Sequence, residues 1–143
     1  MAGVDYGRLK VLVVDDEEYT RRIIRQLLHQ MGVRSIGEAS NGKDALLETL
    51  RTRPDIVFLD VHMKPVGGIE VLRQLRAVKI ADLARTPVIM VTGDANPGTV
   101  GSAKDLAANG YLVKPVALSA LKVRIDAVLG AAAAASGRPN ELT

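Results

Sequence analysis

Three carboxylates, a hydroxyl and an ammonium each lie at the end of a short apolar run in this sequence. Asp15 and Asp16 follow VLVV, Asp60 ends DIVFLD, Thr92 ends VIMVT, and Lys114 follows GYLV. Carboxylates that converge repel one another unless a cation lies among them, and an all-oxygen set suits a hard ion such as Mg²⁺. A cation and an ammonium can neutralise phosphoryl oxygens while a carboxylate attacks phosphorus. These residue types therefore suggest metal-assisted phosphoryl transfer to a carboxylate.

The apolar runs have the length and composition of buried parallel strands. Five of them occur, at residues 10–15, 34–39, 55–60, 86–92 and 110–115. Continuous stretches such as VLVV and VIMV are typical of parallel strands that are covered on both faces. In open sheets of this kind the ligand site lies beyond the carboxyl ends of the strands. We therefore expect the five chemically active residues to meet at one edge of the sheet.

Segments of helical periodicity separate the strands. Apolar residues recur at helical spacing over 23–31, 68–78 and 118–129, and Gly32 ends the first of these segments. Asn41 and Asn96 are typical N-caps of two further helices, the second with Pro97 at its first position. Strands that alternate with helices imply crossover connections, so the predicted fold class is α/β, with helices on both faces of a parallel five-stranded sheet.

The bulk composition suits one globular domain. The chain has 143 residues, of which 48% are hydrophobic, and it has no cysteine. A disulfide framework, a thiol nucleophile and a thiolate metal site are therefore excluded. The N-terminal segment lacks an apolar stretch long enough for a signal-peptide core or a membrane span, so we expect a cytoplasmic protein that does not insert into membranes.

A net charge of +3 and a pI near 9.4 raise the question of nucleic-acid binding. Binding to a phosphate backbone needs a concentrated basic face, and single strands also need aromatic stacking partners. The lysines and arginines are dispersed along the chain, and aromatic residues make up only 3%. We therefore expect no direct nucleic-acid partner.

Several short motifs, in this order, resemble the receiver domain of two-component response regulators, of the single-domain chemotaxis type. They are the acidic pair Asp15-Asp16, DVHM at 60–63 with Gly68 after it, Thr92 followed by Gly93, and YLVKP at 111–115. The resemblance covers residues 9–129, which leaves 1–8 as an N-terminal extension and 130–143 as a small-residue tail or linker stub. It implies a flavodoxin-like, doubly wound (βα)5 fold with strand order 2-1-3-4-5.

The resemblance also implies a role for each residue of the strand-end set. Asp60 would be the phosphoacceptor, and its donor would be a sensor histidine kinase or a histidine phosphotransfer protein. Mg²⁺ would be bound by Asp16 and Asp60 directly, by Asp15 through water, and by the backbone carbonyl of His62. Lys114 would contact the phosphoryl group, and its bond to Pro115 would be cis.

The same resemblance implies a switch rather than an enzyme. Thr92 would move to hydrogen-bond the phosphoryl oxygens and would let Tyr111 turn inward. The fourth helix, fifth strand and fifth helix would form the surface read by a downstream protein, and this surface would also allow a phosphorylation-dependent dimer. Catalysis would be limited to assisting phosphorylation and slow autodephosphorylation of the chain itself. A new phosphoryl charge can bias a surface that has two states.

Three residues near Asp60 and Thr92 are expected to tune the reaction. His62 and Asp94 each lie two residues beyond a strand-end residue. We hypothesise that they face each other across the site and set the phosphoryl lifetime. Lys64 stands where most relatives have proline, and Pro65 comes one position later, so loop conformation and the choice of kinase are expected to differ.

Other interpretations remain open at this point. Asp16, with Glu17 and Glu18, fits a helix N-cap and an acidic first turn, and Asp60 alone fits a turn residue. A phosphatase of the haloacid-dehalogenase type also has a nucleophilic Asp at a strand end, but it needs a second Asp where His62 stands. An unphosphorylated docking scaffold and a fragment of a longer regulator are the remaining alternatives.

Overall fold

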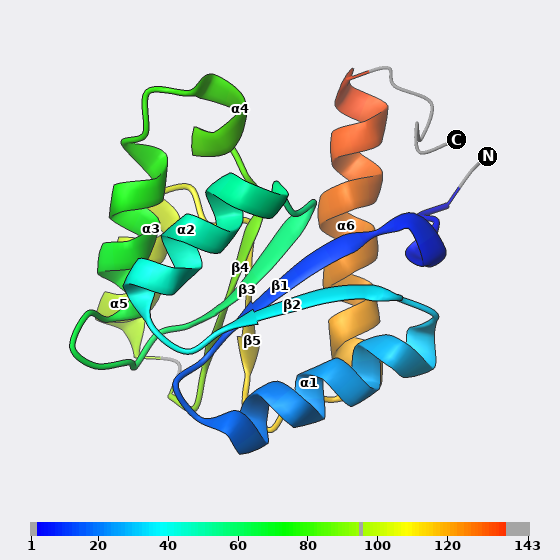
Figure 1. The fold of residues 1–143 in the computed structure, drawn as a ribbon, viewed down its shortest axis with the longest axis horizontal. Helices are drawn as coiled ribbons and strands as arrows, with labels where there is room; N and C mark the ends of the chain where they lie inside the picture. Colours follow the sequence, from blue (N-terminus) through cyan, green and yellow to red (C-terminus); the bar gives the residue numbers. More distant parts are fainter. Residues whose placement is uncertain (1–2, 95, 137–143) are drawn as a thin grey trace.

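A parallel five-stranded sheet forms the centre of the molecule (Figure 1). The computed structural model describes residues 3–94 and 96–136, without the side chains of 131–136. The strands are β1 (Lys10–Val14), β2 (Ser35–Ala39), β3 (Ile56–Asp60), β4 (Val88–Thr92) and β5 (Gly110–Val113). Their order is β2-β1-β3-β4-β5, and every pairing is parallel. The predicted flavodoxin-like sheet and its strand order are confirmed.

Six α-helices and one short 3-10 helix surround the sheet in the part of the chain that the structure describes. The 3-10 helix is η1 (Tyr6–Arg8), and the α-helices are α1 (Glu18–Met31), α2 (Gly42–Thr52), α3 (Gly68–Arg76), α4 (Ala81–Ala84), α5 (Pro97–Asp105) and α6 (Leu118–Ser136). The sequence predicted five helices. The extra one, α4, is a single short turn held by the buried side chain of Leu83. The predicted fourth and fifth helices are therefore α5 and α6.

Two of the predicted helix ends differ from the observed ones. Helix α3 ends at Arg76 rather than at Val78. Helix α6 continues beyond Leu129 to Ser136, because the alanines that follow are strong helix formers. The first half of the expected tail is thus helical, and residues 137–143 lie outside the described part of the chain.

Each face of the sheet has its own hydrophobic core. Alternate residues of a strand point to opposite faces, so Leu12 and Val14 of β1 pack toward α2 and α3, whereas Val11 and Val13 pack toward α1 and α6. Figure 1 shows the same division, with α1 and α6 on one side of the sheet and α2, α3 and α5 on the other. Strands held from both sides in this way provide a rigid base for the residues at their ends.

The predicted N-caps are confirmed. The Asn41 side chain accepts a hydrogen bond from the Asp44 amide at 2.8 Å, and the Asn96 side chain accepts one from Gly98 at 2.8 Å. Helix α5 nevertheless buries only Ala103, and Gly98 and Gly101 add no packing surface to it. Of the longer helices, α5 therefore has the weakest attachment to the core.

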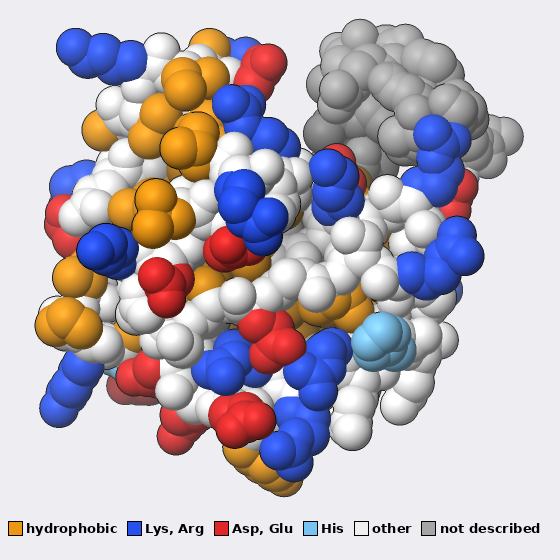
Figure 2. All heavy atoms as spheres, in the orientation of Figure 1, with side chains coloured by type: hydrophobic (Ala, Val, Ile, Leu, Met, Phe, Trp, Pro, Cys, Tyr) orange, Lys and Arg blue, Asp and Glu red, His pale blue; other side chains and the backbone are white. Residues whose placement is uncertain are grey.

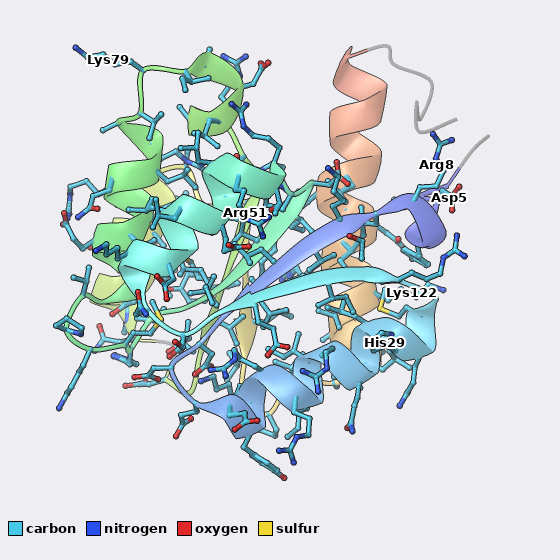
Figure 3. All side chains as sticks on the ribbon, viewed as in Figure 1. Asp5, Arg8, His29, Arg51, Lys79 and Lys122 are labelled. Carbon is cyan, nitrogen blue, oxygen red and sulfur yellow. The ribbon has the colours of Figure 1, made fainter. Side chains whose placement is uncertain are left out.

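Charged side chains of both signs are interspersed on the surface. On the face drawn in Figure 2, Lys and Arg lie among Asp and Glu rather than in one continuous area. The exposed side chains of Arg8, Arg51, Lys79 and Lys122 come from four separate segments, and the side chain of His29 is exposed on α1 (Figure 3). None of the described helices is long and apolar enough to cross a membrane.

Arg76, at the C-terminal end of α3, joins three segments of the structure through its guanidinium. All five of its N–H groups donate: to the carbonyls of Ala84 and Thr86 before β4, to those of Leu106 and Ala107 after α5, and to the side chain of Asn109. Every acceptor is a neutral oxygen. Burial lowers the pKa of Arg76, and the five hydrogen bonds compensate for the lost hydration. Arg76 thus fixes the C-terminal end of α5.

Replacing Arg76 by methionine should lower the free energy of unfolding by roughly 2–3 kcal/mol, because three partly buried carbonyls lose the hydrogen bonds that Arg76 donates. Urea denaturation followed by circular dichroism measures this loss. Arg73→Met is the matched control on the same helix, since exposed Arg73 forms a surface ion pair with its neighbour Glu70, and it should change stability by less than about 0.5 kcal/mol. Equal effects of the two substitutions would contradict the role of Arg76.

Candidate functional site

Backbone hydrogen bonds bring the predicted site residues together at one edge of the sheet. The Asp15 amide donates to Ala39 at 3.1 Å, and the Lys114 amide donates to the carbonyl of Thr92 at 2.8 Å. Asp60 pairs with Val91 at the end of the β3–β4 ladder. The sheet itself therefore aligns the ends of β1, β3, β4 and β5.

Lys114 lies between two buried carboxylates. Its ammonium is 2.9 Å from Asp15 Oδ2 and 3.0 Å from Asp60 Oδ1. Asp15 and Asp60 are 1% and 3% exposed. The contact with Asp15 is a hydrogen bond, whereas the contact with Asp60 is an ion pair that is poorly aligned for one. Asp60 Oδ1 consequently accepts no hydrogen bond from the described residues. A buried oxygen that accepts no hydrogen bond from the protein is available to a ligand.

The surroundings change the acidity of both partners. Burial raises the pKa of Asp60, and the negative charges of Asp15 and Asp16 raise it further against the opposing effect of Lys114. Burial alone would lower the pKa of Lys114, but the hydrogen bond with Asp15 and the negative charges of Asp15 and Asp60 outweigh it and raise that pKa. Lys114 is thus held as a cation, and Asp60 is a carboxylate whose charge is poorly compensated.

Asp15, Asp16 and Asp60 can share a metal ion. One carboxylate oxygen from each lies within 4.8 Å of the others. Asp16 is exposed, which gives water access to an otherwise buried set. Three carboxylates face a single ammonium, so negative charge remains in excess when all are ionised. An all-oxygen set with excess negative charge and one unsatisfied oxygen fits Mg²⁺.

Gly68 is required where α3 begins. A Cβ atom at this position would lie 2.0 Å from the carbonyl oxygen of Asp60, and the Gly68 amide donates to Val61 at 2.8 Å. The first turn of α3 therefore packs directly on the backbone of the acceptor candidate. The glycine after DVHM in the sequence is the signal of this close approach.

Both proline bonds near the site are cis. The Lys114–Pro115 bond is cis, as the resemblance implies, and so is the Lys64–Pro65 bond, which the sequence did not predict. Lys64 and His62 are exposed on the loop after β3, and Asp94 is exposed on the loop after β4. The facing of His62 and Asp94, the ligand role of the His62 carbonyl and the influence of Lys64 stay predictions.

Thr92 and Tyr111 occupy the side of the site toward α5. Thr92 is fully buried, and its hydroxyl donates to the carbonyl of Asp94 at 2.9 Å and accepts from the Asp94 amide at 3.0 Å. Tyr111 packs partly against the core under α2, α3 and α5, and its hydroxyl is buried without a hydrogen-bond partner among the described residues. Thr92 is thus bonded to the loop that leads to α5, and Tyr111 lies in the next strand.

Arg21 lies beside the site, and the sequence did not predict this position. Its guanidinium donates to the backbone carbonyl of Asp15 at 2.7 Å and to the Glu38 carboxylate at 3.0 Å. In the sequence Arg21 is one of several dispersed basic residues. Its contact with Glu38 depends on how β2 lies beside β1, which no local motif encodes.

The pKa shift of Asp60 leads to a pH-dependent prediction. A carboxylate whose pKa is higher in the folded state than in the unfolded state destabilises the folded state once it ionises. For Asp60 this cost is absent at a pH below the pKa of the unfolded chain, near 3.8, and it grows as the pH rises toward the pKa of the folded chain. In Mg²⁺-free buffer, Asp60→Asn should therefore raise the Tm at pH 7.

The increase in Tm should shrink as the pH is lowered through that window. Calorimetric melts of both proteins across the acid range measure it. Asp55→Asn, at the opposite and exposed end of the same strand segment, is the control. A lower Tm for Asp60→Asn at neutral pH would contradict the unfavourable ionisation of Asp60.

Comparison with known proteins places this geometry in a family. The family described as the response regulator receiver domain matches residues 11–126. Chemotaxis protein CheY-3 of Vibrio cholerae is 34% identical over 120 residues, which cover 84% of this chain and 91% of the relative. Chemotaxis protein CheY of Pseudomonas aeruginosa is 36% identical over 120 residues, with 84% and 95% covered.

Solved structures agree with this assignment. The chemotaxis protein CheY4 of Vibrio cholerae superposes with a TM-score of 0.77 at 29% identity and covers 84% of this chain and 98% of its own. The receiver domain of a modulated diguanylate cyclase from Desulfovibrio desulfuricans gives a TM-score of 0.75 at 28% identity, with 86% and 94% covered. The chain that carries Asp60 and Lys114 at these strand ends therefore belongs to the response regulator receiver domain family.

Proposed function

We propose that this chain is a signalling switch that accepts a phosphoryl group on Asp60. The observation that carries the proposal is the buried Oδ1 of Asp60, which accepts no hydrogen bond from the described residues and lies beside the ammonium of Lys114 and the carboxylates of Asp15 and Asp16. A carboxylate that is desolvated and poorly compensated is reactive toward phosphorus once a cation screens the repulsion. The donor would be a phosphohistidine of a sensor kinase or phosphotransfer protein, encountered in the cytoplasm.

Each residue of the site has a distinct part in this reaction. An Asp60 oxygen forms a bond to phosphorus while the bond from phosphorus to the donor breaks, and the electron pair leaves with the donor's imidazole. Asp15, Asp16, Asp60 and the His62 carbonyl would hold Mg²⁺, which supplies charge neutralisation at the phosphoryl oxygens. Lys114, held as a cation by its two carboxylates, neutralises a further phosphoryl oxygen.

Phosphorylation would be transmitted through Thr92. Its hydroxyl is occupied by the Asp94 backbone, so a bond to a phosphoryl oxygen requires Thr92 to exchange those partners. That exchange would release the loop leading into α5, the helix with little buried surface. Tyr111 would respond because its buried hydroxyl has no hydrogen-bond partner among the described residues, and a movement that supplies one is favoured.

The readout surface would lie on α5, β5 and α6. Two hollows of about 270 and about 440 Å³ adjoin each other there, and Tyr111 and Arg124 line both. Lys104 adds a second cation to the smaller hollow, and exposed Val113 and Val123 border the larger one. A downstream protein segment with apolar and acidic side chains would suit this surface, and a phosphorylation-dependent dimer would use the same face.

Acetyl phosphate, a small-molecule phosphoryl donor, tests the proposal without knowledge of the kinase. With Mg²⁺ present, intact mass spectrometry should detect one added phosphoryl group on the unsubstituted chain and none on Asp60→Asn. Asp55→Asn is the matched control, because Asp55 is exposed at the other end of this segment, and it should be modified normally.

The other candidate functions predict different results. A haloacid-dehalogenase-like phosphatase would hydrolyse unrelated phosphate esters rapidly, and a docking scaffold would acquire no phosphoryl group. If Asp60→Asn acquired a phosphoryl group as readily as the unsubstituted chain, Asp60 would not be the phosphoacceptor.

A further inference from the structure

Asp15 is held at every polar atom, and Arg21 provides one of these contacts. The Asp15 amide donates to Ala39, its Oδ1 accepts from the Glu17 amide at 2.9 Å, and its Oδ2 accepts from Lys114. The remaining atom, the backbone carbonyl oxygen, accepts from Arg21 Nη1 at 2.7 Å. This carbonyl belongs to the peptide bond that joins Asp15 to Asp16. Its orientation therefore sets the direction in which Asp16 leaves β1.

Arg21 is itself held in place by Glu38 of β2, which also binds Arg25. Its Nε donates to Glu38 Oε1 at 3.0 Å, and Arg25 Nη1 donates to Glu38 Oε2 at 2.6 Å. Partial burial alone would raise the pKa of Glu38, but the hydrogen bonds and charges of both arginines outweigh it and lower that pKa, which favours the carboxylate form. The Arg21 side chain is only 16% exposed. Strand β2 thus holds a largely buried guanidinium against the loop that carries the acidic pair.

We propose that Arg21 is a positioning residue for the metal site. It acts by fixing the Asp15–Asp16 peptide so that the carboxylate of Asp16 lies with those of Asp15 and Asp60. The inference rests on the proposed function, because it concerns the Mg²⁺ on which phosphorylation of Asp60 depends. Removing a residue that holds a metal ligand in place commonly weakens metal binding by about 10–100-fold.

The positioning role and a simple charge effect predict opposite results. A guanidinium near three carboxylates repels a divalent cation, so its removal should tighten Mg²⁺ binding if charge alone matters. If Arg21 instead holds Asp16 in place, its removal should weaken binding. Substitution with neutral glutamine therefore distinguishes the two effects.

Isothermal titration calorimetry with Mg²⁺ alone tests the inference on the full chain. Arg21→Gln should bind Mg²⁺ about 10-fold more weakly than the unsubstituted chain. Arg22→Gln is the matched control, because it removes the same charge from the next residue, which is exposed and forms a long ion pair of 3.9 Å with Glu18. Its affinity should be unchanged. Glu38→Gln should give an intermediate loss, and it tests the same point if Arg21→Gln does not fold.

A kinetic measurement separates positioning from general loss of structure. With acetyl phosphate as donor, Arg21→Gln should need a higher Mg²⁺ concentration for half-maximal phosphorylation but should approach the normal rate at saturating Mg²⁺. Unchanged or tighter Mg²⁺ binding by Arg21→Gln would overturn the inference, and so would an equal loss in Arg22→Gln. If the unsubstituted chain bound no Mg²⁺ at all, the metal site and this inference would both fall, whereas phosphorylation of Asp60 would be judged separately by its mass.

Discussion

The Lys114 ammonium between the carboxylates of Asp15 and Asp60 is the interaction on which the rest of the structure depends. Two carboxylates this deeply buried would be strongly unfavourable without a cation, and one ammonium cannot compensate for three acids. The folded chain therefore retains excess negative charge at the ends of its strands. This residual charge is what makes the site suitable for a metal ion and Asp60 suitable as an acceptor.

The structure around this cluster combines rigid and weakly held parts. The central strands are covered on both faces, and Gly68 lets α3 pack directly on the backbone of Asp60. In contrast, α5 buries little, and Arg76 fixes only its C-terminal end. The N-terminal end of α5 follows the loop to which Thr92 is bonded. A change at the acceptor can therefore reach this loop without disturbing the strands.

The sequence predicted those features that depend on local pattern and strand order. Apolar runs identified the five strands, and parallel topology then brought Asp15, Asp60 and Lys114 to one edge. The contacts of Arg21 with Glu38 and of Arg76 with two loops were not predictable, because they join segments far apart in the chain. Helix α4 was missed because four residues are too few to show periodicity. The buried Tyr111 hydroxyl depends on packing that no motif encodes.

The central claim is that the excess negative charge at Asp15, Asp16 and Asp60 binds Mg²⁺. A titration followed by amide chemical shifts in nuclear magnetic resonance tests it most directly. Mg²⁺ should shift the amides of residues 15–17 and 60–63 at low concentration and leave the opposite end of the sheet, near Lys10 and Ile56, unchanged. Uniform shifts over the surface, or none near Asp60, would contradict the account.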